Sequence, residues 1–238
     1  NTLTNTGMIS GAGTTKGYGI IVVTKSSVGT ITNSGTIVGN QTSSSLDENS
    51  GVGIIISSSS TINTLTNTGM ISGSATDTGV GVWLYNTSSI TTLTNTGTIS
   101  GLGITAGGFG IALTKSSINT LTNTGVISGS ASGGGGADTS GNGVWLDDTS
   151  SITTLTNSGT ISGVAANDSA FGVNVNSANN TITTLTNTGM ISGSITGAGV
   201  NAFGIRNDSG VITTFNNYQK SLTYSGTLPD NYTTIIDD

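Results

Sequence analysis

The amino-acid sequence predicts an all-β protein, a parallel β-helix that places three short strands in each rung. Three observations support this class. Nearly the same letters return about every 30 residues, the repeats contain short runs rich in Val, Ile and Thr, and no segment has the 3.6-residue period of an amphipathic helix. About seven to eight rungs of 28 to 34 residues then account for the 238-residue chain.

One asparagine per repeat marks the period. It stands in motifs such as Leu-Thr-Asn-Thr, and successive copies are 28, 34, 28, 28, 34 and 30 residues apart. The column consists of Asn5, Asn33, Asn67, Asn95, Asn123, Asn157 and Asn187, with Asn217 in a degraded last copy. Propeller blades need about 40 to 50 residues and four strands, so this shorter period favours a solenoid.

The first strand of each repeat follows a glycine, as in residues 81–84. Side chains of a strand alternate between its faces, so Val82 and Leu84 are expected to point into the core. Apolar residues also occupy the equivalent inward positions: Ile20/Val22, Ile54/Ile56, Ile111/Leu113, Val144/Leu146 and Val173/Val175.

The second and third strands of this repeat are residues 90–94 and 97–101. The same alternation places Leu93, Asn95 and Ile99 inside the coil. It places Thr94, Thr96 and Thr98 outside. Ile90 lies three residues before Leu93, so the chain must bend at Thr91 or Thr92 if both are to face inward.

Differences in repeat length collect between the third strand and the next glycine, in segments 40–50, 74–79 and 130–141. Insertions there leave the strands in register, which is typical of surface loops. Residues 1–206 are therefore predicted to form the repeats, and residues 207–238 an atypical terminal rung or cap of the same domain. The chain begins within a repeat, which suggests a piece of a longer protein or a processed product.

The composition excludes several classes of function. Only 7% of residues are charged and the net charge is -6, which argues against a nucleic-acid partner because such a surface needs a basic stripe. The chain has no cysteine and no histidine, so disulfides, thiolate metal sites and these two catalytic side chains are impossible. No apolar run approaches the roughly 20 residues that span a bilayer, so direct membrane insertion of this segment is not expected.

The repeated TLTNTGTISG, with glycine-led strands between copies, resembles the passenger regions of bacterial autotransporter proteins, which are rich in N-(T/S/N)-G-x-I-x-G repeats. The closing SLTYSGTLPDNYTTII resembles segments that follow such repeats. The resemblance covers nearly the whole chain. It implies a right-handed β-helix displayed outside the cell and used for adhesion, aggregation or as a stalk.

Two polar features invite a chemical interpretation. The asparagine column is either a row of ligand-binding amides or a structural ladder whose side chains hydrogen-bond one another, and the ladder is favoured because buried polar groups are normally paired. Residues 133–138, GGGGAD, match half of a calcium-binding nonapeptide, but Ser140 stands where a large apolar residue is expected, so a flexible loop is favoured.

Asp147 and Asp148 resemble the paired acids of sugar-cleaving β-helix enzymes. Adjacent strand residues point to opposite faces, so these two carboxylates cannot act on one bond unless the strand has ended. Asp148 is better explained as a turn residue. We expect no catalytic residue, no cofactor and no metal ligand in this chain.

An outward column beside the first strand is the main candidate contact surface. Ile21, Ile55, Trp83 and Trp145 occupy equivalent positions in this stripe. Ala112 stands between the two tryptophans, and Asn174 and Arg206 continue the stripe. Aromatic side chains at alternating rungs, roughly 10 Å apart, are typical of interfaces. The alternative is that the long loops fold over the stripe.

Threonine pairs form a second outward feature: Thr4/Thr6, Thr66/Thr68, Thr94/Thr96, Thr122/Thr124 and Thr186/Thr188. Regular threonine ladders on flat solenoids resemble those of ice-binding proteins. Ser34 and Ser158 interrupt the second member of the pairs, and threonine suits any exposed strand. Three functions therefore remain: a non-enzymatic surface protein that binds itself or a host or neighbouring cell, a subunit that stacks into an extracellular filament, and an ice-binding solenoid.

Overall fold

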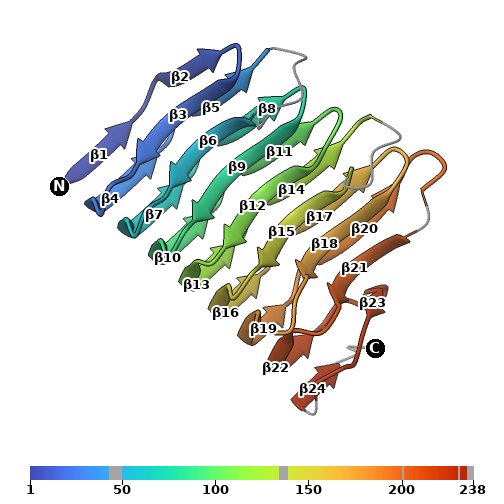
Figure 1. Ribbon diagram of the computed structural model, residues 1–238. Coiled ribbons are helices and arrows are strands. Elements are labelled where there is room, and N and C mark those ends of the chain that lie inside the picture. Colours follow the sequence, from blue (N-terminus) through green and yellow to red (C-terminus); the bar gives the residue numbers. More distant parts are fainter. Residues whose placement is uncertain (43–49, 134–138, 200, 230, 235–238) are drawn as a thin grey trace.

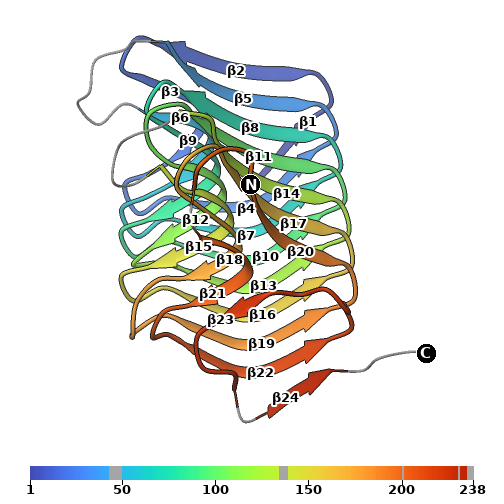
Figure 2. The same cartoon turned by 90° about the vertical axis from the view of Figure 1, so that its right-hand side faces the viewer.

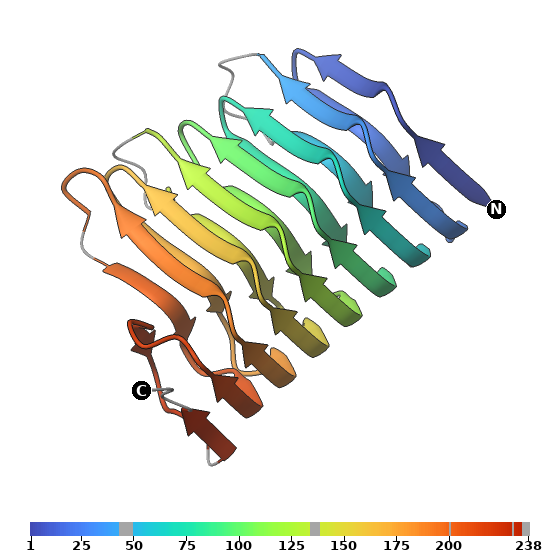
Figure 3. The ribbon, with the colours of Figure 1, turned by 180° about the vertical axis from the view of Figure 1, so that it is seen from behind.

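The computed structural model describes residues 1–42, 50–133, 139–199, 201–229 and 231–234, which form a parallel β-helix of about seven turns (Figure 1). These described residues contain strands, bends and turns but no helix. The predicted fold class, with three strands in each rung, is confirmed. The strands at residues 2–5 and 231–234 lie at opposite ends of the stack, as Figure 3 shows from behind.

Every strand pairs in parallel with its counterpart one rung away, and the pairs build three sheets. Sheet A contains β1 (Thr2–Asn5), β4 (Ser27–Asn33), β7 (Thr61–Asn67), β10 (Ser89–Asn95), β13 (Ser117–Asn123), β16 (Ser151–Asn157), β19 (Thr181–Asn187), β22 (Val211–Asn217) and β24 (Asn231–Thr234). Sheet B contains β2 (Met8–Gly13), β5 (Thr36–Gln41), β8 (Met70–Ala75), β11 (Thr98–Gly103), β14 (Val126–Ala131), β17 (Thr160–Ala165) and β20 (Met190–Ile195). Sheet C contains β3 (Lys16–Val22), β6 (Ser50–Ile56), β9 (Thr78–Tyr85), β12 (Gly108–Thr114), β15 (Gly141–Asp147), β18 (Ser169–Val175), β21 (Asn201–Asn207) and β23 (Tyr224–Ser225).

The core is a stack of similar apolar layers, one from each rung. In one rung Leu84 of sheet C, Leu93 of sheet A and Ile99 of sheet B are all fully buried. Complete burial of such a side chain stabilises the fold by about 1.5–3 kcal/mol. Pairing in sheet A skips Thr91, which marks the bend that lets both Ile90 and Leu93 face inward.

Glycines allow sheets B and C to approach each other closely near the loops that join them. A Cβ atom on Gly73 would lie 2.0 Å from the carbonyl oxygen of Val80, and one on Gly101 would lie 2.0 Å from that of Phe109. At the end of the sheet B strands, Ala131 and Ala165 are buried, and the larger Gln41 and Ile195 occupy the same register position in other rungs.

The corner between sheets C and A contains a buried serine ladder. Residues such as Asn86 and Thr87 turn the chain with φ angles of 56° and 63°, and the next residue, Ser88, is buried. The hydroxyl of each serine accepts a hydrogen bond from the backbone N–H of its counterpart one rung earlier, over 3.1 to 3.3 Å. The ladder comprises Ser60, Ser88, Ser116 and Ser150, and Asn180 accepts from Ser150 at its end. Sequence analysis missed this ladder, although a Ser-Ser or Ser-Thr pair precedes most strands of sheet A.

The C-terminal region continues the stack before changing its pattern. Strand β22 pairs in register with β19, and Phe215 takes the place of the usual core leucine. Figure 2 shows β24 following β22 at this end.

Sheet B ends at β20, and there the side-chain amide of Gln219 pairs with the backbone of Ile191. Ile191 N donates to Gln219 Oε1 at 2.7 Å, and Gln219 Nε2 donates to Ile191 O at 3.2 Å. Tyr224 packs near Phe215, and burial raises the pKa of its phenol.

Candidate functional site

The asparagine column lies inside the corner between sheets A and B. Asn95 is fully buried, and its Nδ2 donates to Asn123 Oδ1 at 2.8 Å, to Val126 O at 3.0 Å and to Gly97 O at 3.2 Å. The same side-chain link joins every consecutive pair of the column, from Asn5 to Asn217. These amides form hydrogen bonds with one another and with backbone groups, so they link each rung to the next.

The two neighbouring acids at the end of β15 have separate partners. Asp147 Oδ1 accepts a hydrogen bond from Asn176 Nδ2 at 3.2 Å. Asp148 lies in the turn, with φ of 49°, and forms an ion pair with Lys115 at 3.0 Å. The hydrogen bond from Lys115 to Asp148 raises the pKa of the lysine. This arrangement joins neighbouring turns.

The predicted contact stripe runs along the outer face of sheet C, in register from rung to rung. Ile21 is 52% exposed, Trp83 and Trp145 are half-buried, and Ala112 between the tryptophans is 1% exposed. The stripe packs against the buried side chains of Val52, Val80 and Phe109. The alternative that long loops fold over it concerns residues 43–49 and 134–138, which lie outside the described residues.

A second outward column, which sequence analysis missed, lies beside the stripe. It stands immediately before the strand glycine and consists of Tyr18, Val52, Val80, Phe109, Asn142, Phe171 and Phe203. Strict alternation would place Phe109 on the same side as Ile111, but pairing skips Gly110 and the strand bends there. Phe109 therefore faces outward and stacks on Trp145, with ring centroids 4.9 Å apart.

The two columns form the floor of a groove, named here the sheet C groove, that contains three hollows of about 360 Å³ each. The first hollow is lined by Ile55 and Trp83, and the second by Trp83, Ala112 and Trp145. The third is lined by Trp145 and extends to Arg206. The second hollow lies beside Ala112, whose small side chain stands between the two tryptophans at the same register position. Residues between sheets B and C, such as Asp77 and Ala106, form one wall.

The third hollow is the most polar part of this groove. Asn142 Nδ2 donates to Ser140 Oγ at 2.9 Å, and Asn174 Nδ2 donates to Asn142 Oδ1 at 3.1 Å. Asn174 is 3% exposed, and its Oδ1 is buried with no hydrogen-bond partner among the described residues. The Arg206 guanidinium lies 5.2 Å from the centroid of Phe171.

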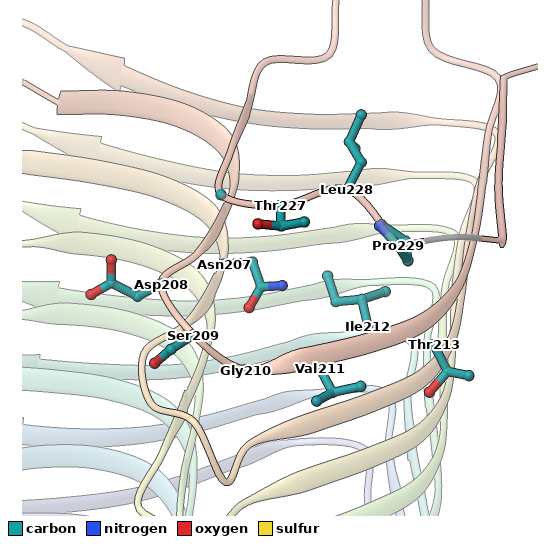
Figure 4. Close-up of a pocket in the computed structure, with 11 residues that line it drawn as sticks. Asn207, Asp208, Ser209, Gly210, Val211, Ile212, Thr213, Thr227, Leu228 and Pro229 are labelled. Carbon is teal, nitrogen blue, oxygen red and sulfur yellow. The ribbon is translucent and has the colours of Figure 1, made fainter.

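A further cavity of about 580 Å³ lies in the C-terminal region (Figure 4). Figure 4 shows Leu228 and Pro229 opposite Val211 and Ile212, with Asn207 between the two segments. Its lining within the described residues contains no aromatic ring. The sheet C groove combines rings with polar groups and is the stronger candidate for recognition.

The outer face of sheet A contains threonines in a different arrangement from the predicted one. Thr96 and its equivalents lie in the bend after the strand, so the pairs such as Thr94/Thr96 do not share one flat sheet. The partner of Thr94 within the strand is Thr92. One column comprises Thr2, Thr30, Thr64, Thr92, Thr120, Thr154, Thr184 and Thr214, and the other comprises Thr4, Thr32, Thr66, Thr94, Thr122, Thr156 and Thr186.

Residues 134–138, most of the segment that matches half of a calcium-binding nonapeptide, lie outside the described residues. Within the described ranges no group of three or more acidic, His or Cys side chains is placed to hold a metal ion. The same ranges contain no helix that is long and apolar enough to cross a membrane.

Comparison with known proteins finds no match among protein-family models, curated proteins or solved structures.

Proposed function

We propose that this chain is a non-enzymatic adhesive or self-associating scaffold, displayed outside a bacterial cell, and that its contact surface is the sheet C groove. The observation that carries the proposal is the in-register placement of Trp83 and Trp145 on one open face. Tryptophan is enriched among the residues that dominate interface energies. The resemblance of the repeats to bacterial passenger regions supports the location.

The distribution of polar groups supports a binding role in preference to catalysis. The sequence contains neither histidine nor cysteine. The adjacent acids at the end of β15 are both engaged: Asp147 with Asn176, and Asp148 with Lys115. The groove instead offers ring surfaces, amides and hollows. Such a mixture of apolar walls with a few placed polar groups is typical of binding sites.

The double variant Trp83→Ser with Trp145→Ser tests this proposal. We expect it to remove sedimentation-detected self-association, or attachment of the labelled protein to bacterial and epithelial cells, because both large ring surfaces are lost. The matched control is Met70→Ser with Met190→Ser, which removes exposed apolar side chains from sheet B. Thermal melting of both variants reports whether the fold is retained.

Three results would distinguish the alternatives. Loss of self-association or cell attachment in the tryptophan variant alone supports the groove as the contact surface. Equal loss of that activity in the methionine variant would place the contact on sheet B and contradict the proposal. Filaments in electron micrographs that persist in the tryptophan variant would favour end-to-end stacking, the alternative in which the rungs of one copy continue onto the next.

The threonine columns of sheet A favour ice binding as a second candidate. The two columns are separated by two residues along the strand, about 7 Å, and repeat every 4.8 Å or so between rungs. A flat, uncharged and regular array of hydroxyl and methyl groups can order water at its surface. Thr94→Lys with Thr122→Lys should abolish inhibition of ice recrystallisation, while Ser100→Lys on sheet B should not, and an inactive natural chain would eliminate this candidate.

A further inference from the structure

We infer that the third hollow of the sheet C groove binds a neutral saccharide, an inference that rests on the proposed function and names the partner chemistry. The hollow lies on the outer face of β12, β15, β18 and β21, between Phe109 and Arg206. Its volume of about 360 Å³ is within the range of small-ligand sites.

Asn174, one of the residues that line the hollow, has a buried carbonyl oxygen that lacks a hydrogen-bond donor among the described residues. The chain of hydrogen bonds from Asn174 through Asn142 to Ser140 uses the amide N–H groups and leaves Asn174 Oδ1 unpaired among the described residues. An unsatisfied buried acceptor is unfavourable, so a ligand that donates a hydrogen bond there gains more than it would in water. A sugar hydroxyl is such a donor.

Aromatic rings supply the second half of the recognition. Trp145 lines the hollow and is backed by Phe109, which stacks on it at 4.9 Å and 29°. Phe171 forms another part of the lining. The faces of aromatic rings are electron-rich, and the C–H groups on one face of a pyranose ring carry the complementary partial positive charge.

The charges around the hollow select a neutral ligand. The one cation, Arg206, is already paired with Asp208 at 2.6 Å and donates to Asn176 Oδ1 at 3.3 Å. Asp168 lines the hollow and accepts a hydrogen bond from the Ser169 hydroxyl at 3.2 Å. An anionic sugar would meet this carboxylate, whereas a neutral sugar can donate hydroxyl hydrogen bonds to it.

The arrangement of the groove further favours a chain of sugars over a single one. Trp83 and Trp145 lie two rungs apart, roughly 10 Å along the solenoid axis, and each separates two hollows. A linear oligosaccharide lying along the axis therefore meets a ring surface and a hollow in turn. Affinity is expected to rise with the number of sugar residues.

The test is titration of the full chain with cello-, malto-, manno- and chitohexaose, with a hexagalacturonate as the acidic counterpart. Both tryptophans of the chain lie in the groove, so selectively excited tryptophan fluorescence reports on this surface, and calorimetry gives the affinity. We expect at least one neutral hexamer to bind at micromolar to millimolar concentrations, more tightly than its dimer, and the acidic hexamer not to bind.

Variants locate the binding. Asn174→Leu keeps the approximate side-chain shape but removes both the acceptor and the donor to Asn142, and it should weaken binding by roughly tenfold; thermal melting reports whether the fold is retained. Asp168→Asn, at the half-exposed rim, should weaken it without affecting the fold. The Met70→Ser, Met190→Ser control should bind like the natural chain.

Several outcomes would overturn the inference: no neutral hexamer binds, the acidic hexamer binds best, or both variants bind as tightly as the natural chain. If no saccharide binds but Trp83→Ser with Trp145→Ser still abolishes association or cell attachment, the partner is a protein surface and only this inference fails. If that double variant is also without effect, the proposed function fails with it.

Discussion

The asparagine column shows how one residue, repeated at one place in every rung, joins the rungs of a solenoid. Asn95 accepts from Asn67 and donates to Asn123 at 2.8 Å in each case. Both neighbours are fully buried, so neither can form a replacement hydrogen bond with water when the Asn95 amide is removed. The same logic applies to the serine ladder at the opposite corner.

Asn95→Ala should destabilise the protein by about 3 kcal/mol, because Asn123 Oδ1 loses its donor and several buried hydrogen bonds disappear. For a chain of this size the thermal midpoint should fall by about 10 °C. Circular dichroism melting measures it, with Asn119→Ala on the exposed face of sheet A as the matched control. Equal midpoints for the two variants would show that the ladder adds no stability.

Among the elements, β20 depends on a substitute for a neighbouring strand. It is the last strand of sheet B within the described residues, and the amide of Gln219 takes up the N–H and C=O of Ile191. The same Gln219 Oε1 accepts from Asn187 Nδ2 at 3.1 Å. One side chain thus covers an edge that would otherwise present unpaired backbone groups.

Gln219→Ala should therefore loosen β20 selectively. We expect amide hydrogen exchange to become faster in Met190–Ile195 and to stay unchanged in β14, which lies two strands away in the same sheet. Lys220→Ala, an exposed neighbour, is the control. Unchanged exchange in β20, measured by mass spectrometry, would mean that Gln219 is dispensable for covering this edge.

The elements also show what repetition and alternation can and cannot predict. The period located all three strands of the rung, and the alternation of Val82 and Leu84 correctly assigned the core face of sheet C. Alternation failed at Gly110, where the bend turns Phe109 outward and creates the second column of the groove. The hollows themselves depend on loops of unequal length, whose path a repeat pattern does not specify.

At the scale of the whole molecule, charge is segregated. Within the described residues, the strands of sheets A and B contain no Asp, Glu, Lys or Arg, whereas sheet C contains Lys16, Asp147 and Arg206. The remaining described charges lie in turns, in loops or in the C-terminal region. One face of the solenoid is therefore chemically varied and the other two are regular, which supports the proposal that recognition uses sheet C.

Contact through the sheet C groove is tested most directly by hydroxyl-radical footprinting of the protein, free and bound to cells. Both tryptophans of the chain, Trp83 and Trp145, lie in the groove, and its three methionines, Met8, Met70 and Met190, lie on sheet B. Binding should protect the tryptophans from oxidation while the methionines remain as reactive as in the free chain. Protection of the methionines with unchanged tryptophan oxidation would contradict the assignment of the groove as the contact surface.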